Sequence, residues 1–210
     1  MILERLVVGM LQTNCYLLAD PETRHAAVID PGGDADRIIA RIQHHQLEVV
    51  SILNTHGHFD HVLDAWSLQG KTGGQIALHR DDQPVLQDRS VGLMAVFTSL
   101  KRSPKGPVDR WVREGDQVEV GRFHLEVLET PGHTPGHVSY YLPEADLIFV
   151  GDTLFAGSIG RTDFPGGSYE QLIRSVRDKI FPLAESTKVY PGHGPETTVG
   201  LEKRTNPFFQ

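Results

Sequence analysis

The hexapeptide His-Gly-His-Phe-Asp-His at residues 56–61 is the segment from which the fold and the chemistry of this chain can both be inferred. It places three imidazoles and one carboxylate in one short stretch, and both groups are ligands for zinc, iron and manganese. The segment offers more ligand atoms than one catalytic ion takes from a single stretch of chain. The sequence therefore predicts a site for two metal ions.

Four loops, the hexapeptide among them, follow a predicted strand and carry a candidate ligand. The hexapeptide comes directly after the apolar strand 48–54. The other loops are Thr-Pro-Gly-His at 130–133, Gly-Asp at 151–152 and Pro-Gly-His-Gly at 191–194. The end of a strand holds a ligand in a fixed position, and Gly and Pro let the backbone turn tightly around an ion. The four loops therefore form one candidate constellation.

Hydrophobic periodicity and breaker residues divide the chain into short strands and helices. Strands are predicted at 2–9, 14–20, 25–30, 48–54, 75–79, 117–120, 122–129, 137–142, 146–151 and 187–190, and helices at 35–46, 62–72, 81–88, 168–181 and 195–205. Segment 89–109 is predicted to be a short helix followed by an exposed loop. This order of elements suits two sheets packed together with helices outside, a four-layer α/β/β/α sandwich.

Length, charge and cysteine content limit the classes to which the chain can belong. Its 210 residues suffice for a single domain, 1–210, with a sizeable core. The net charge is −7 with His neutral, and no basic run supports nucleic-acid binding. No apolar stretch approaches the roughly 20 residues of a membrane helix. Cys15, the one cysteine, allows no intramolecular disulfide, which fits a cytoplasmic location.

The ligand-bearing loops resemble, in order and spacing, those of the metallo-β-lactamase superfamily. The resemblance runs from Asp30 to His193. Within the superfamily the chain is most similar to the glyoxalase II group (hydroxyacylglutathione hydrolases) in its short bacterial form, and residues 155–167 support that likeness. The chain is expected to lack the C-terminal helical extension with which long glyoxalase II enzymes bind glutathione.

The resemblance implies a role for each candidate residue. The implied metal ligands are, for one ion, His56, His58 and His133; for the other, Asp60, His61 and His193; and for both, Asp152. Asp60 and Asp152 are also the expected catalytic residues. Asp30 is expected to brace a ligand loop as a structural carboxylate. His137, in the same loop as His133, could be an eighth ligand, but we expect it to support the site from outside the ligand set.

The implied reaction is metal-dependent hydrolysis of S-D-lactoylglutathione or a related acyl thioester. Two cations about 3.5–4 Å apart would hold a bridging hydroxide that attacks the carbonyl carbon. One cation would stabilise the charge that develops on the carbonyl oxygen. Zinc is the expected metal, with iron and manganese as alternatives. The expected partner is a small-molecule thioester, with a glutathione conjugate as the first candidate, and the oligomeric state stays open.

Plainer interpretations exist for some of these residues. A single structural zinc is one, but such sites usually have cysteine ligands and four closed positions, whereas this chain offers His and Asp. Arg161 has two interpretations. It either pairs with Asp163 in a surface turn or reaches the pocket mouth and meets a substrate carboxylate.

An iron-dependent persulfide dioxygenase is the main alternative function. Such enzymes share this scaffold and a stretch similar to Gly-Arg-Thr-Asp-Phe at 160–164, but use one iron held by two His and one Asp. Hydrolysis of another small ester or thioester, a β-lactamase or lactonase activity, and non-catalytic metal binding also stay open. Metal content and oxygen uptake would separate the dioxygenase from the hydrolase.

Overall fold

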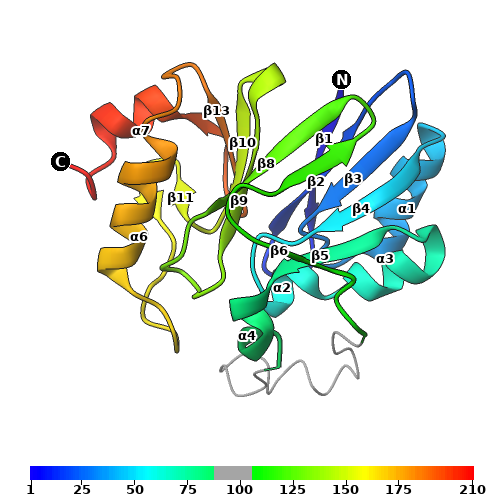
Figure 1. The fold of residues 1–210 in the computed structure, drawn as a ribbon, viewed down its shortest axis with the longest axis horizontal. Helices are drawn as coiled ribbons and strands as arrows, with labels where there is room; N and C mark the ends of the chain where they lie inside the picture. Colours follow the sequence, from blue (N-terminus) through cyan, green and yellow to red (C-terminus); the bar gives the residue numbers. More distant parts are fainter. Residues whose placement is uncertain (88–105) are drawn as a thin grey trace.

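Two six-stranded β-sheets pack face to face (Figure 1). The computed structural model describes residues 1–87 and 106–210. In spatial order the first sheet contains β1 (Ile2–Val8), β2 (Thr13–Ala19), β3 (His25–Ile29), β4 (Glu48–Leu53), β5 (Gln75–His79) and β6 (Arg110–Val112). The second contains β14 (Thr197–Thr198), β13 (Lys188–Pro191), β10 (Leu147–Gly151), β9 (Val138–Leu142), β8 (Phe123–Glu129) and β7 (Gln117–Val120). A separate hairpin pairs β11 (Leu154–Phe155) with β12 (Ser158–Ile159).

Helices cover the outer face of each sheet, as Figure 1 shows, and the predicted four-layer α/β/β/α sandwich is confirmed. The helices are α1 (Ala35–His44), α2 (Phe59–Val62), α3 (Ala65–Thr72), α4 (Gln83–Gln87), α6 (Tyr169–Ser175) and α7 (Val199–Thr205). α1 and α3 pack on the first sheet. α6, its π-helical continuation Val176–Ile180, and α7 pack on the second. Among the described residues, no helix combines the length and apolar character needed to cross a bilayer.

Strand β2 illustrates how the sequence builds these layers. All seven of its residues are buried, which explains its nearly continuous apolar run. Successive side chains of a strand point to opposite faces. Tyr16 and Leu18 accordingly face the other sheet, whereas Cys15 and Leu17 pack in the cluster that contains α1 and α3.

Strand direction brings the ligand loops to one edge. β3, β4, β5 and β6 run parallel to one another, and β10 runs parallel to β13. The hexapeptide follows β4, while Asp152 and His193 follow β10 and β13. Neighbouring parallel strands end at the same edge of a sheet, so Asp152 and His193 lie close together. The backbone N–H of Asn14 in β2 donates to Gly192 O at 2.7 Å and joins this edge to the first sheet.

Several predicted boundaries were wrong. The helix predicted at 62–72 is split between α2, which starts inside the hexapeptide, and α3. The helix predicted at 195–205 starts at Val199, because Thr197 and Thr198 pair with β13 as β14. Strands β6, β11, β12 and β14 were missed, since strands of two or three residues are too short to show periodicity. Of the predicted segment 89–109, residues up to 105 lie outside the described part of the chain.

An ion pair between the buried Asp20 and the half-exposed Arg122 joins the two sheets away from the ligand loops. The Asp20 carboxylate, at the end of β2, accepts hydrogen bonds from Nε and Nη2 of Arg122, both at 2.9 Å. It also accepts from the backbone N–H of Arg122 at 3.0 Å. Arg122 lies in the turn between β7 and β8. These bonds lower the pKa of Asp20 well below its usual range, although burial opposes the shift.

We expect Asp20→Asn to destabilise the protein in a pH-dependent way. A carboxyl whose pKa is lower in the folded state contributes stability above its unfolded pKa of 3.8 and loses that contribution as the pH falls further. The stability difference between the parent and the variant should therefore be largest above about pH 4 and shrink below it. Urea unfolding of both metal-free proteins between pH 7 and pH 2 measures this difference. A difference that does not vary with pH would contradict the assignment.

Candidate metal centre

The seven predicted metal ligands lie together in the structure. Their ligand atoms form three overlapping groups in which all atoms lie within 4.8 Å of one another. The groups are His56 with His58 and His133; His56 with His61 and Asp152; and Asp60 with His61 and His193. We call the first group the first cluster and the last group the second cluster. Each cluster draws on the hexapeptide after β4 and on a loop of the second sheet.

Hydrogen bonds fix which ring nitrogen of the first cluster carries a lone pair. The Oγ1 of Thr55 donates to Asp30 at 2.8 Å, so it accepts from Nδ1–H of His56 at 3.0 Å. The Nδ1–H of His133 donates to the carbonyl of Arg161 at 2.7 Å. The Nε2 atoms of both imidazoles are therefore unprotonated in the neutral rings.

These two Nε2 lone pairs point at the same atom. Nε2 of His56 lies 3.1 Å and Nε2 of His133 lies 2.9 Å from Nδ1 of His58. One proton on that Nδ1 can satisfy one of the two neighbours and not both. A cation among the three nitrogens would satisfy all of them, so the donor set fits a metal ion.

The second cluster contains buried polar atoms without partners. His61 donates from Nδ1 to Asp30 Oδ2 at 3.0 Å, which leaves its Nε2 as the ligand atom. This Nε2 lies 3.5 Å from Asp152 Oδ1 and 3.6 Å from Asp60 Oδ2. Within residues 1–87 and 106–210, neither His61 Nε2 nor Asp152 Oδ1 has a hydrogen-bond partner. Orphaned buried groups are rare, and two that face each other across a gap fit an ion between them.

Asp152 faces both clusters. Its Oδ2 lies 3.6 Å from Nε2 of His133 and 3.7 Å from Nε2 of His193. Its Oδ1 faces His61, as described above. His193 also lies 3.2 Å from Asp60 Oδ2. The geometry therefore agrees with the bridging position that we expected for Asp152.

The protonation states suit metal binding. Burial lowers the pKa of His56 well below its usual range, and burial together with His133 lowers the pKa of His58 to about 4. Burial opposes the ionisation of Asp152, but the imidazoles around it, first that of His61, lower its pKa. In turn, the carboxylates raise the pKa of His61 against the effect of burial. Neutral imidazoles and ionised carboxylates are the forms that bind a metal, so His56, His58 and Asp152 favour the binding form, whereas His61 would release its proton when an ion binds.

Asp30 and His137 contact metal-ligand residues or their neighbours through hydrogen bonds. Asp30 accepts from the backbone N–H and Oγ1 of Thr55 and from His61, so it contacts residues on both sides of the hexapeptide. His137 is fully buried and stacks on the His56 ring at 5.0 Å. Its Nε2 accepts from the backbone N–H of Asp152 at 3.1 Å, so that lone pair is already used. This bond agrees with a supporting role for His137 and not with a role as an eighth ligand.

Arg161 forms the local pair with Asp163 that was the first of its two predicted arrangements, and its role toward a substrate stays a prediction. Its guanidinium donates to both carboxylate oxygens of Asp163, at 2.9 and 2.7 Å, in a pair that is largely exposed. The same guanidinium stacks over the Phe164 ring at 4.3 Å, and that ring lies 5.5 Å from the His58 ring. The local pair thus forms at the rim of the first cluster.

Sequence reasoning missed Asp82, which holds two ligand loops together. This buried carboxylate accepts from the backbone N–H of Gly57 at 2.7 Å, from Thr134 Oγ1 at 2.8 Å and from the backbone N–H of Gly136 at 2.6 Å. Gly57 lies between two ligands of the first cluster, and Thr134 follows the third. No local pattern marked Asp82, because it falls in a polar turn after β5.

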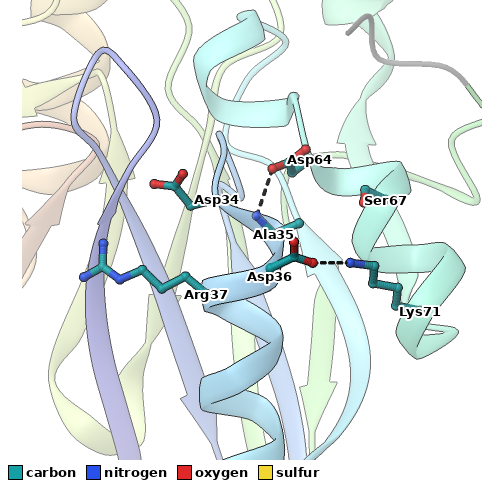
Figure 2. Close-up of a pocket in the computed structure, with 7 residues that line it drawn as sticks. All are labelled: Asp34, Ala35, Asp36, Arg37, Asp64, Ser67 and Lys71. Atoms are coloured by element: carbon teal, nitrogen blue, oxygen red, sulfur yellow. Dashed lines mark hydrogen bonds and ion pairs between the residues drawn. The ribbon is translucent and has the colours of Figure 1, made fainter.

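A polar hollow of about 520 Å³ lies elsewhere, at the start of α1 (Figure 2). Asp64 accepts from the backbone N–H of Ala35 at 2.9 Å, and Lys71 pairs with Asp36 at 2.5 Å. These contacts join α1 to α3. None of the residues that line the hollow is a predicted metal ligand. The hollow is therefore separate from the first and second clusters.

The ligand geometry agrees with the family comparison. The profile of the metallo-beta-lactamase superfamily matches residues 8–193. The chain belongs to this superfamily. Members of the superfamily bind divalent metal ions, and this chain presents His and Asp clusters that fit them. The chain is also 43% identical, over 99% of its length and 98% of the relative, to the hydroxyacylglutathione hydrolase GloC of Haemophilus influenzae. It is thus an enzyme of the metallo-hydrolase kind and resembles the glyoxalase II group.

Solved structures show the same fold. BLEG-1 B3 metallo-beta-lactamase superposes with a TM-score of 0.92, at 37% identity over 100% of both chains. TTHA1623 in a di-iron-bound form has a TM-score of 0.85, at 38% identity over 98% of this chain and 99% of that one. ETHE1 from Myxococcus xanthus has a TM-score of 0.82, at 32% identity over 99% of this chain and 84% of that one.

Proposed function

We propose that this protein is a binuclear thioesterase that hydrolyses S-D-lactoylglutathione or a related acyl thioester. The observation that carries the proposal is the pair of adjoining clusters that share Asp152, with lone pairs and orphaned atoms directed into both. The similarity to GloC supports the substrate class. The proposal takes zinc as the metal, and includes a cytoplasmic location, which the single and fully buried Cys15 supports.

Bound divalent cations would lower the pKa of water and offset negative charge on a carbonyl oxygen. Asp152 and Asp60 would hold the cations through their carboxylate oxygens. Asp152 presents one oxygen to His61 and the other to His133 and His193. Asp60 turns Oδ2 toward His61 and His193. A thiolate leaves readily, so no side chain has to act as a strong general acid.

The rim beside the first cluster would receive the acyl-thiol substrate. Phe164 lies against His58, and the guanidinium of Arg161 stacks over the Phe164 ring. Asp163 uses two of the guanidinium's donors and holds it in place. We propose that the unused N–H donors of the Arg161 guanidinium at this rim favour substrates that carry a carboxylate, as glutathione conjugates do.

An iron-dependent persulfide dioxygenase is the second candidate. The similarity to ETHE1 fits it, and the di-iron form of TTHA1623 shows that a protein 38% identical to this one can hold iron. The His and Asp donors of both clusters suit iron as well as zinc. The two candidates differ in their consumption of oxygen.

A thioester panel with counted metals tests the proposal. Protein loaded with zinc, iron or manganese is assayed on S-D-lactoylglutathione, on an uncharged acyl thioester, and on glutathione persulfide with an oxygen electrode. We expect two ions per chain, thioester hydrolysis without oxygen uptake, and a lower KM for the carboxylate-bearing thioester. In the Arg161→Gln control, the difference in KM between the two thioesters should narrow.

Two outcomes of this assay would contradict the proposed thioesterase. Oxygen uptake on the persulfide by the iron form, with no thioester hydrolysis by any form, would replace the first candidate with the second. Absence of both activities in a protein that carries two ions per chain would reject both candidates.

A further inference from the structure

Besides Asp30, which contacts both clusters, each cluster has supporting residues of its own. The hairpin of β1 and β2 contacts the second cluster through two consecutive buried residues, Thr13 and Asn14. Thr13 donates from Oγ1 to Asp60 Oδ2 at 3.2 Å. This is the carboxylate oxygen that faces His61 and His193. The hydroxyl thus occupies one lone pair of that oxygen and fixes the rotation of the carboxylate.

Asn14 holds the loop that carries His193. Its side-chain amide donates to the carbonyls of Pro191 and Gly194, both at 2.9 Å. Its backbone N–H donates to Gly192 O at 2.7 Å. The three accepting carbonyls lie on both sides of His193 in the sequence. One residue of β2 therefore fixes the turn that presents this imidazole.

The first cluster has a different brace. Asp82, in the turn after β5, joins the loop of His56 and His58 to the loop of His133 through Gly57 and Thr134. Among residues 1–87 and 106–210, the hydrogen bonds of the Asp82 side chain reach no residue of the second cluster, and those of the Thr13 and Asn14 side chains reach none of the first. Thr13 with Asn14, and Asp82, thus each support one cluster, whereas Asp30 contacts His61 directly and His56 through Thr55.

We propose that Thr13 and Asn14 are positioning residues that set the metal affinity of the second cluster independently of the first. The inference rests on the metal centre of the proposed function and adds to it that the two sites can be emptied one at a time. Groups outside the ligand set orient the ligands, and their loss typically weakens metal affinity by about 10–100-fold. Here that loss is expected at one cluster alone.

Stepwise zinc binding tests the inference. Metal-free parent, Thr13→Val, Thr13→Ser, Asn14→Ala and Asp82→Asn proteins are titrated with zinc against a chromophoric chelator, which gives two successive dissociation constants. Thr13→Val keeps the shape of the side chain and removes the hydroxyl, whereas Thr13→Ser keeps the hydroxyl. Crystals grown with one equivalent of zinc, analysed by anomalous scattering, identify the cluster that fills first.

We expect Thr13→Val and Asn14→Ala to weaken one zinc-binding step by about 10–100-fold, with the remaining ion in the first cluster. Thr13→Ser should bind both zinc ions with the same dissociation constants as the parent. Asp82→Asn should weaken the other step and leave the ion in the second cluster. Thermal unfolding of the metal-free variants serves as the check that each one folds.

The outcomes separate this inference from the proposed function. A parent protein that binds fewer than two zinc ions overturns the binuclear proposal and this inference with it. A parent that binds two ions, alongside a folded Thr13→Val with both constants unchanged, overturns this inference alone. Equal weakening of both steps in Thr13→Val also overturns it.

Discussion

Replacement of Asp152 with asparagine is expected to lower kcat/KM for thioester hydrolysis by about a thousand-fold or more. Asp152 faces both clusters, with one carboxylate oxygen toward His61 and the other toward His133 and His193. The amide has the same shape but no negative charge. Neither cluster then keeps its shared anionic oxygen, so both lose a ligand through a single substitution.

Stability measurements distinguish this loss from misfolding. In the metal-free protein the Asp152→Asn substitution removes the attraction between the carboxylate and the imidazoles around it, but the amide can still donate to Nε2 of a neutral His61, so the metal-free variant should still unfold cooperatively. The rise in unfolding temperature on addition of zinc should shrink, because the stabilisation from binding grows with the logarithm of the affinity. The exposed Asp36→Asn is the matched control and should keep parental activity. An active Asp152→Asn enzyme with two bound ions would disprove the bridging role.

Gly32→Ala is expected to destabilise the protein by about 3 kcal/mol or more and to reduce activity by more than about tenfold. A Cβ added at Gly32 would lie 1.4 Å from the backbone oxygen of Asp60. The obstacle is a backbone atom of the ligand loop, so no side chain can rotate away to make room. The loop must move, and Asp60 and His61 move with it.

Gly70→Ala is the control for this prediction. It adds the same methyl group inside α3, where no atom lies within 4 Å of the new Cβ. Alanine favours a helix over glycine, so Gly70→Ala should stabilise the protein by about 0.5–1 kcal/mol. Chemical unfolding of the two variants and the parent, together with zinc titration, measures both effects. Parental stability in Gly32→Ala would show that the Gly32 turn can shift without disturbing the ligand loop.

The sequence was sufficient for the parts of the site that are dense and local. The hexapeptide at 56–61 predicted metal binding, because three imidazoles and a carboxylate seldom occur in so short a segment unless they bind a metal ion. The layered fold followed from strand and helix periodicity in long elements such as β8 and α1. In both cases the signal lies within about a dozen neighbouring residues.

The parts that could not be predicted depend on contacts between distant segments. Asp82 accepts hydrogen bonds from two ligand loops, yet the sequence around it has the pattern of an ordinary polar turn. Thr13 and Asn14 belong to an ordinary strand, and their partners Asp60 and Gly194 lie far along the chain. Strand β6 exists because a buried partner strand, β5, stabilises three residues that lack a pattern of their own.

The distribution of ligands over the two sheets has a consequence for the lifetime of the protein. Strands β1 to β6 form one sheet and strands β7 to β10, β13 and β14 form the other, and each cluster takes donors from both halves of the chain. An ion in either cluster would act as a removable cross-link between the N-terminal and C-terminal halves of a chain that has no disulfide. When the cell lacks metal, the contact between the two halves would weaken and the protein would become more sensitive to proteases. The abundance of the protein would therefore follow the metal supply.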